Sequence, residues 1–140
     1  MSGNVNICEI TDEVKQLLKD FRFRKVKDTA ALILKVDREK QQIILDEQLD
    51  DTSIESLQEN LPSHQPRFVV LSYKQEHKDG RISYPLCFIF LTPQDSHPEL
   101  QLMYAGSKLA LQKEADLSRA YEIRELDDFT EEWLLGKLGN

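Results

Sequence analysis

The sequence predicts one domain of the α/β (α+β) class, in which a central mixed β-sheet is flanked by helices on both faces. Segments with helical periodicity alternate with short runs of branched apolar residues, in the order αββαββαβα. The run at residues 86–91 is apolar on both faces, as in a strand covered by helices on each side. A chain of 140 residues without a repeat or linker is expected to form one domain over residues 1–140, with residues 1–8 mobile.

The amino-terminal part is expected to form a helix followed by a hairpin. Residues 11–22 place apolar side chains at helical spacing, and Thr11 or Asp12 is available as the N-cap. Residues 29–37 and 41–49 are rich in branched apolar side chains. The polar sequence "DREK" between these two runs is typical of a turn that joins paired strands.

A short helix is expected next, ending by Pro62. Its start fits two registers, with Ser53 followed by Ser56 or with Thr52 followed by Glu55. Only the second pair satisfies the capping-box rule, so Thr52 is the predicted N-cap.

The carboxy-terminal part is expected to contain a second hairpin, a long helix, a strand and a final helix. Asp79 and Gly80 lie between two apolar runs, which is a strong hairpin signal. The long helix is expected from Pro98 to about residue 117, because the fixed φ of proline suits a first helical turn. Residues 118–125 are the last candidate strand, and residues 127–139 form an amphipathic helix that ends at a glycine. That helix is expected to turn inward Phe129, Trp133, Leu134 and Leu138.

Charge is unevenly distributed along the chain. The formal net charge of −7 argues against broad binding to nucleic acids or anionic membranes. Residues 15–40 are nevertheless basic, with nine Lys or Arg against four acids, whereas residues 42–60 carry six acids and no Lys or Arg. Residues 114–132 carry eight acids against two arginines. A surface divided in this way would orient a protein partner, and ordinary solvated faces are the alternative explanation.

The sequence lacks the short motifs that indicate catalysis or cofactor binding. It contains no P-loop, no G-x-G-x-x-G and no G-x-S-x-G, and its three histidines are isolated in polar contexts. We therefore expect no cofactor and no metal, and we keep an enzyme only as an alternative whose residues would meet on folding. The amino terminus lacks the features of a signal peptide, so a cytosolic location and two free cysteines are expected, with Cys87 in the core and Cys8 near a mobile terminus.

The segment "MYAGSK", residues 103–108, places Gly106 and Ser107 in the middle of the long helix. A glycine inside a helix costs about 0.5–1 kcal/mol relative to alanine. A requirement other than helix stability is therefore expected at Gly106. From the residues alone, close packing within the domain and close approach of a partner both remain open.

Several motifs together resemble the actin-depolymerising factor homology family, whose best-known members are the cofilins. The segment "MYAGSK", preceded by "YPLCFIF", is similar to the signature of this family. The segments "FRFRK", "QPRFVVLSYK", "DGRISYPLCFIF" and "DDFTEEWLLGKL" resemble a branch of the family that binds the Arp2/3 complex. The resemblance spans essentially the whole chain and implies a single ADF-homology domain.

This resemblance implies a non-enzymatic regulator of the actin cytoskeleton. Members of the branch bind actin-related subunits of the Arp2/3 complex, inhibit its nucleation of actin and promote debranching of filament networks. The resemblance further implies a monomer with little or no direct actin binding, located in the cytoplasm at branched networks of the cell cortex and also in the nucleus. Nucleic acids and membranes are not expected partners.

The main alternative is a cofilin-like protein that binds and severs actin filaments. Cofilins carry two lysines before the corresponding helical motif that contact actin, and the matching positions here are Glu99 and Gln101. An acid and an amide in place of two cations disfavour the actin surface built for lysines. A secreted growth-factor-like protein is a further alternative, opposed by the missing signal peptide and disulfides.

The resemblance implies a partner site in which the long helix enters a cleft of an actin-related subunit. Small residues at Ala105, Gly106 and Ser107 would let the cleft approach the helix backbone closely. Leu102, Gly106 and Leu109 are expected to face outward, and the line facing the sheet is expected to comprise Leu100, Met103, Tyr104 and Leu111.

The full set of implied contacts includes a basic cluster after the first helix and the amino terminus. Phosphorylation of Ser2 would add about −1.5 to −2 charges and is expected to block docking. The implied Arp2/3-binding residues are Ser2, Gly3, Asn4, Arg22, Arg24, Lys25, Leu102, Ala105, Gly106, Lys108 and Leu109, with a second contact at Lys78, Asp79 and Arg81.

Overall fold

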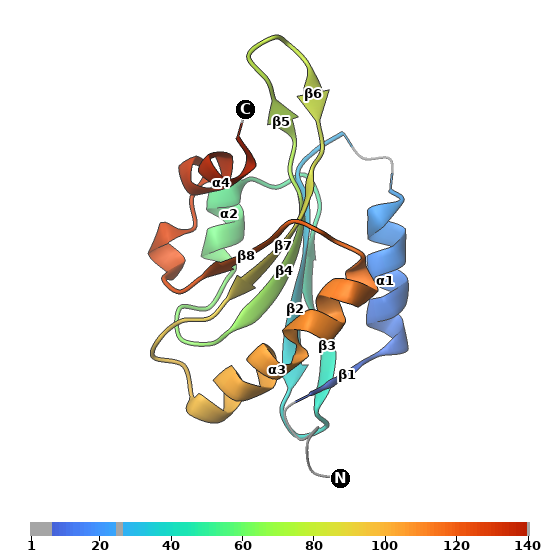
Figure 1. The fold of residues 1–140 in the computed structure, drawn as a ribbon, viewed down its shortest axis with the longest axis vertical. Coiled ribbons are helices and arrows are strands. Elements are labelled where there is room, and N and C mark those ends of the chain that lie inside the picture. The colour runs from blue at the N-terminus through green and yellow to red at the C-terminus, as the bar shows by residue number, and fades with distance from the viewer. Residues whose placement is uncertain (1–6, 25–26, 140) are drawn as a thin grey trace.

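The computed structural model describes residues 7–24 and 27–139, which form a mixed sheet with helices on both faces (Figure 1). The predicted fold class and order of the main elements are confirmed, and three short strands and a 3-10 helix are added to them. In chain order the elements are β1 (Glu9–Ile10), α1 (Asp12–Arg22), β2 (Ala30–Asp37), β3 (Gln42–Leu49), α2 (Ile54–Glu59), β4 (Arg67–Ser72), β5 (Gln75–Glu76), β6 (Ile82–Ser83), β7 (Leu86–Leu91), α3 (Pro98–Ala115), β8 (Ala120–Ile123), the 3-10 helix η1 (Leu126–Asp128) and α4 (Glu131–Leu138).

The main sheet has six strands in the order β1-β3-β2-β4-β7-β8. The four central strands pair antiparallel, whereas β1 joins β3 and β8 joins β7 in parallel. Strands β5 and β6 form a separate two-stranded ribbon that extends the hairpin between β4 and β7. The two predicted hairpins are therefore confirmed, and the parallel strands at both edges make the sheet mixed.

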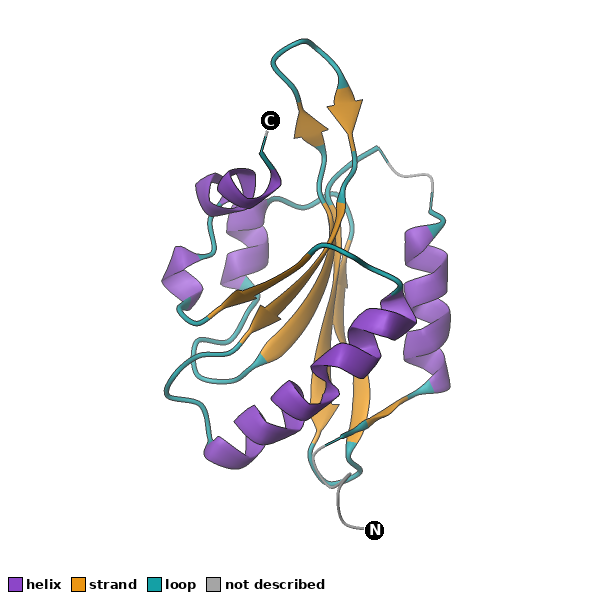
Figure 2. Ribbon diagram, in the orientation of Figure 1, coloured by secondary structure: helices purple, strands orange, loops and turns teal. Residues whose placement is uncertain are grey.

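Helices cover both faces of this sheet, with α1 and α3 on one face and α2 and α4 on the other (Figure 2). Because side chains alternate along a strand, β7 contributes to both cores. Phe88 and Phe90 lie in the core under α1 and α3, whereas Cys87, Ile89 and Leu91 lie in the core under α2 and α4. This double burial confirms the prediction from the two-sided apolar run.

Side-chain hydroxyls cap the amino-terminal ends of α1 and α2. The Val14 N–H donates to Thr11 Oγ1 at 3.3 Å, which confirms Thr11 as an N-cap. The predicted cap Thr52 is wrong, because the N–H of Ser56 donates to Ser53 Oγ at 3.1 Å and α2 begins one residue later. The Thr52 N–H is held by the Thr29 carbonyl at 2.8 Å, which orients the chain before the helix.

The carboxy-terminal helices differ slightly from their predicted bounds. Helix α3 ends two residues early because Asp116 adopts a left-handed conformation with a φ of 56°. The predicted final helix is divided into η1 and α4, since Thr130 caps a new helix by accepting from the Trp133 N–H at 3.1 Å. The predicted inward residues Phe129 and Leu134 are buried, and Trp133 and Leu138 pack against the same core.

The described part of the chain begins against α3. Residues 1–6 lie outside the described residues, so the mobility predicted for residues 1–8 stays a prediction there. Cys8, expected near a mobile terminus, is instead buried, and burial raises the pKa of its thiol. Cys87 is fully buried, as predicted. None of the helices in the described ranges is long and apolar enough to cross a membrane.

Candidate partner-binding surface

Helix α3 presents an apolar line to solvent. Leu102 is 57% exposed and Leu109 is 69% exposed, and Ala105 and Gly106 between them are also exposed. The four residues expected to face the sheet are buried or partly buried in the core, namely Leu100, Met103, Tyr104 and Leu111. The predicted orientation of the two lines is therefore confirmed, which leaves two large leucines unburied on a rigid helix.

Tyr104 fixes the rotation of α3 about its own axis. Its side chain is 1% exposed, and its ring centroid lies 5.1 Å from that of Phe68 in β4. Its hydroxyl accepts a hydrogen bond at 2.9 Å from the backbone N–H of Val36 in β2. Burial raises the pKa of the Tyr104 hydroxyl, so the group stays neutral. A helix anchored by a deep aromatic and a hydrogen bond holds its outer leucines in one orientation.

Ser107 does not belong to the outer face, which corrects the expectation for the small residues of this helix. It is fully buried, its hydroxyl accepts from the Cys8 N–H at 2.8 Å, and it donates to the Met103 carbonyl at 2.8 Å. Its spacing of four residues from both Met103 and Leu111 was the signal that placed it on the inner line. Ser107 thus attaches the amino-terminal strand to α3.

Arg22 and Arg24 of the basic cluster lie apart and carry acidic partners. Arg22 Nη1 lies 3.0 Å from Asp116 Oδ2, which connects the carboxyl end of α1 to that of α3. Asp116 and Leu109 line the same shallow hollow, so Arg22 lies at one end of the exposed line. Arg24 Nη2 instead lies 2.6 Å from Asp50 Oδ1, beyond the end of β3.

Phe23 is a surface residue that the sequence reasoning missed. Its side chain is 67% exposed, and the Arg22 guanidinium carbon lies 4.8 Å from the centre of its ring. An aromatic just past a helix end and outside the helical spacing of the core residues was the available signal. Phe23 therefore adds an exposed apolar group beside the Arg22–Asp116 pair.

Glu99 and Gln101 at the start of α3, where the resemblance implies lysines in cofilins, are held by internal contacts. Glu99 Oε1 lies 2.5 Å from Arg38 Nε in the turn between β2 and β3, and this hydrogen bond lowers the pKa of the Glu99 carboxyl. The side-chain amide of Gln101 donates to the carbonyls of Ser96 at 2.8 Å and Gln94 at 3.3 Å. Both side chains thereby order the entrance to the helix.

Lys108 and the hairpin tip lie to the side of the exposed line. Lys108 Nζ is 3.7 Å from Glu122 Oε1 and 5.8 Å from the Phe90 ring centre, so it extends toward β7 and β8. At the tip, Arg81 donates through Nε to Asp79 at 2.7 Å. Figure 1 shows the tip at the end of the molecule opposite β1, so it does not join the α3 surface. Ser2, Gly3, Asn4 and Lys25 lie outside the described residues.

The chain matches known proteins along its whole length. Residues 7–139 match the sequence model of the cofilin/tropomyosin-type actin-binding proteins. Glia maturation factor from Drosophila melanogaster is 63% identical over 138 residues, with 99% of each chain covered. The chain belongs to the family of cofilin/tropomyosin-type actin-binding proteins.

Within the family it falls in the glia maturation factor group. Human glia maturation factor beta is 49% identical, with 99% of this chain and 98% of the relative covered. The solution structure of the Caenorhabditis elegans glia maturation factor matches with a TM-score of 0.82 at 46% identity, covering 98% of this chain and 99% of that one. The Plasmodium berghei actin depolymerization factor 2 structure also reaches 0.82, at 22% identity over 95% of this chain and 97% of that one, which shows the fold alone. The family resemblance found in the motifs is thereby confirmed.

Proposed function

We propose that this protein binds the Arp2/3 complex, inhibits its nucleation of actin and promotes the release of filament branches in the cytoplasm. A role in regulating actin follows from membership of the glia maturation factor group. The observation that carries the finer proposal is the exposed line of Leu102, Gly106 and Leu109 on α3. In this proposal the protein acts by occupying a surface of the Arp2/3 complex, and its action involves no covalent chemistry.

The exposed line has the properties of a helix that docks into an apolar groove. Its leucines are seven residues apart, so they lie on the same side of α3, with Gly106 between them. Tyr104 and Ser107 anchor the opposite side, so little conformational entropy is lost when the helix binds. The absence of a side chain at Gly106 lets the groove of an actin-related subunit approach the backbone.

The proposed contact also includes the amino terminus. The hydrogen bond between the Cys8 N–H and Ser107 Oγ positions the chain at the middle of α3, one residue from Gly106. Ser2, Gly3, Asn4 and Lys25 lie outside the described residues, and we include them in the proposed contact. Phosphorylation at Ser2 would add negative charge to the amino terminus, and we expect it to weaken docking.

Glu99 and Gln101 support the Arp2/3 complex over actin as the target. The Glu99 carboxylate is fixed by Arg38, and Gln101 is fixed by two loop carbonyls. A cation-accepting surface on actin would meet an acid and an amide here and lose its charge-assisted contacts. A cofilin-like severing activity is the alternative that this arrangement disfavours.

The decisive test is a binding assay of wild type and Gly106→Lys against the Arp2/3 complex, monomeric actin and filamentous actin. We expect micromolar or tighter binding to the complex, little binding to actin, and loss of binding in the variant, because a lysine obstructs close approach. Gly136→Lys is the matched control, since Gly136 is an exposed helical glycine of α4 with nothing within 4 Å of an added Cβ. Strong actin binding, or no binding to either target, would refute the proposal.

A further inference from the structure

The outer edge of β8 offers a site for an additional strand. Strand β8 is the last strand of the sheet, and among the residues described no strand pairs with its outer side. We propose that this edge, with the groove beside it, binds an extended lysine- or arginine-rich segment of another protein by β-strand addition. This site does not include the outer line of α3, although Glu122 lies 3.7 Å from Lys108 of that helix.

The hydrogen-bonding pattern leaves backbone groups of β8 directed outward. The N–H groups of Phe88 and Thr92 donate to the carbonyls of Arg119 at 2.8 Å and Ile123 at 2.9 Å, in register with a parallel β7–β8 pair. Because such bonds use every second residue of a strand, Ala120 and Glu122 direct their N–H and C=O groups to the outer edge. An incoming strand would therefore find two consecutive pairing positions.

A groove of about 770 Å³ runs from this edge to α4. The second half of β8 forms one side of the groove, and the exposed face of α4 forms the other. Trp133 is its aromatic wall, and its ring is held edge-on against Tyr121 of β8 and Phe129, with centroid distances of 6.1 and 5.8 Å. Because the Trp133 ring is already held in place, little conformational entropy is lost when a peptide binds against it, which favours binding.

The charges of the groove determine the kind of partner. Asp127, Asp128 and Glu132 line it, and none of them takes part in an ion pair within the described ranges. The cations in the lining are Arg124, which already lies 3.9 Å from Glu122, and Lys137, whose Nζ lies 5.9 Å from the Trp133 ring centre. A basic segment would compensate the three carboxylates.

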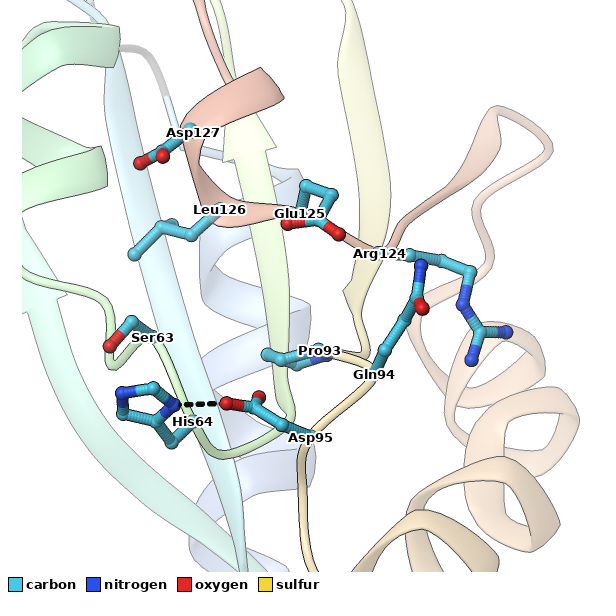
Figure 3. Close-up of a pocket in the computed structure, with 9 residues that line it drawn as sticks. All are labelled: Ser63, His64, Pro93, Gln94, Asp95, Arg124, Glu125, Leu126 and Asp127. Carbon is cyan, nitrogen blue, oxygen red and sulfur yellow. Dashed lines mark hydrogen bonds and ion pairs between the residues drawn. The ribbon is translucent and has the colours of Figure 1, made fainter.

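A second hollow of about 300 Å³ continues the groove and shares Arg124 and Asp127 with it. Figure 3 shows His64 and Asp95 facing each other on one side of this hollow, with Arg124 on the opposite side. His64 Nδ1 lies 2.5 Å from Asp95 Oδ2. Glu125 adds a further carboxylate to the lining. The acidic surface is therefore longer than the strand edge and suits an extended segment.

A second copy of this chain fits the edge poorly. Two β8 edges paired around a twofold axis would bring the acidic linings of both copies together, and like charges in contact oppose association. Charged residues on a short edge strand are also a common protection against unwanted pairing. The proposal therefore requires that a basic peptide, and not the protein itself, occupies the edge.

The experiment is a titration with the acetylated and amidated hexapeptide Lys-Val-Lys-Val-Lys-Val, followed by tryptophan emission and amide hydrogen exchange. Trp133 is the single tryptophan, so its emission reports occupancy of the groove directly. We expect a saturable change in emission and slower exchange of the Ala120 and Glu122 amides. The same peptide with alternate amides N-methylated, and a Glu-Val peptide, are expected not to bind.

A matched pair of variants separates backbone pairing from charge. Glu122→Pro removes the outward N–H, whereas Glu122→Val makes the same change in charge but keeps the N–H. Proline is tolerated on an edge strand. We expect the proline variant to lose at least about tenfold in affinity and the valine variant to retain most of it. Asp127→Asn with Asp128→Asn is expected to weaken binding and reduce its salt dependence.

Several outcomes would overturn the proposal. These are equal binding of the N-methylated peptide, unchanged exchange at Ala120 and Glu122 in a saturated complex, or no binding of the basic peptide. Concentration-dependent dimerisation through β8 would also overturn it, because a second copy would then be the occupant. If Glu122→Pro fails to fold, the N-methylated peptide and the amide exchange of the wild type decide between the outcomes.

Discussion

Ser107 shows how one side chain can serve the partner surface without belonging to it. Its hydroxyl accepts from the Cys8 N–H and donates to the Met103 carbonyl, both within the core. The serine therefore attaches β1 to the middle of α3, on the side of the helix opposite the exposed leucines. A residue of this kind supports the surface through the stability and position of the helix.

Ser107→Ala is expected to destabilise the protein by about 1–3 kcal/mol, because the buried Cys8 N–H loses its acceptor. Urea unfolding followed by circular dichroism measures the free energy of unfolding. Ser118→Ala, at an exposed serine just after α3, is the control and is expected to change it by less than about 0.5 kcal/mol. A Ser107 variant as stable as the control would show that the hydrogen bond to Cys8 contributes nothing.

The thiol of Cys87, buried in the core under α2 and α4, also affects the stability of the protein at high pH. Burial raises its pKa from 9.0 to about 11 in the folded protein. The raised pKa favours the folded state fully below pH 9, and this contribution is lost as the pH rises from 9 to 11, where only the unfolded chain ionises.

The free energy of unfolding of wild type is accordingly expected to fall by about 2–3 kcal/mol more than that of Cys87→Ala between pH 8 and pH 11. Urea unfolding at both pH values measures the difference between the two proteins. The tyrosines are present in both, so their titration cancels in the comparison. Parallel pH profiles for the two proteins would contradict the expected contribution of this thiol.

At the scale of the element, the proposed contact of α3 would explain a glycine that lowers the stability of the helix. The cost of a glycine in a helix is set by backbone entropy and does not depend on what the glycine contacts. Gly106 lies on the exposed outer line of the helix. The proposed partner contact offers a reason for a glycine at this position.

Gly106→Ala is expected to raise the free energy of unfolding by about 0.5–1 kcal/mol while weakening binding to the Arp2/3 complex. Gly136→Ala should stabilise α4 by a similar amount, since an added Cβ there has open space, and should leave the affinity unchanged. The measurements are urea unfolding and a binding titration for both variants. A Gly106→Ala protein with undiminished affinity would argue that the partner does not approach the backbone at this point.

At the scale of the whole molecule, the choice between actin and the Arp2/3 complex is expected to lie in few surface charges on a shared fold. The sheet and helices resemble those of an actin depolymerization factor at only 22% identity. Glu99 and Gln101, at the entrance of α3, are therefore candidates for determining the target. The Glu99–Arg38 ion pair is exposed and contributes little to stability, whereas the hydrogen bond from Gln101 to the Ser96 carbonyl is partly buried.

The double variant Glu99→Lys with Gln101→Lys is expected to gain at least about tenfold in affinity for actin, because two cations add charge-assisted contacts. Co-sedimentation with filaments and a titration of monomeric actin measure the gain. Glu55→Lys with Glu59→Gln on α2 makes the same change in net charge at a distant site and is the control. An equal gain in the control would indicate general charge attraction.

The sequence was sufficient for the fold class and for the orientation of α3, because both depend on periodic apolar patterns. Leu102 and Leu109 are seven residues apart and were separable from the inner line by spacing alone. Strand β1 was missed because two residues carry no periodicity, and its pairing with β3 depends on a contact distant in the sequence. The α2 register was mistaken because Ser53 caps the helix although the residue three positions later is Ser56 and not an acid.

The candidate surface was only partly predictable, because ion pairs between distant segments leave no local pattern. Arg22 and Arg24 form one basic motif in the sequence, yet Asp116 and Asp50 draw them to different places. Phe23 was overlooked although it lies just past a helix end and outside the helical spacing of the core residues, because this position does not show whether a distant segment covers the ring.

The attachment of β1 to α3 has a consequence for the order of folding. The hydrogen bond between Cys8 and Ser107 spans 99 positions of the chain, whereas the hairpins β2–β3 and β4–β7 close over short loops. Loop-closure entropy delays distant contacts, so the hairpins are expected to assemble before β1 reaches the helix. On the ribosome β1 can pair with β3 early, but its attachment to α3 waits until that helix has been synthesised, so the proposed partner surface is completed only late in translation.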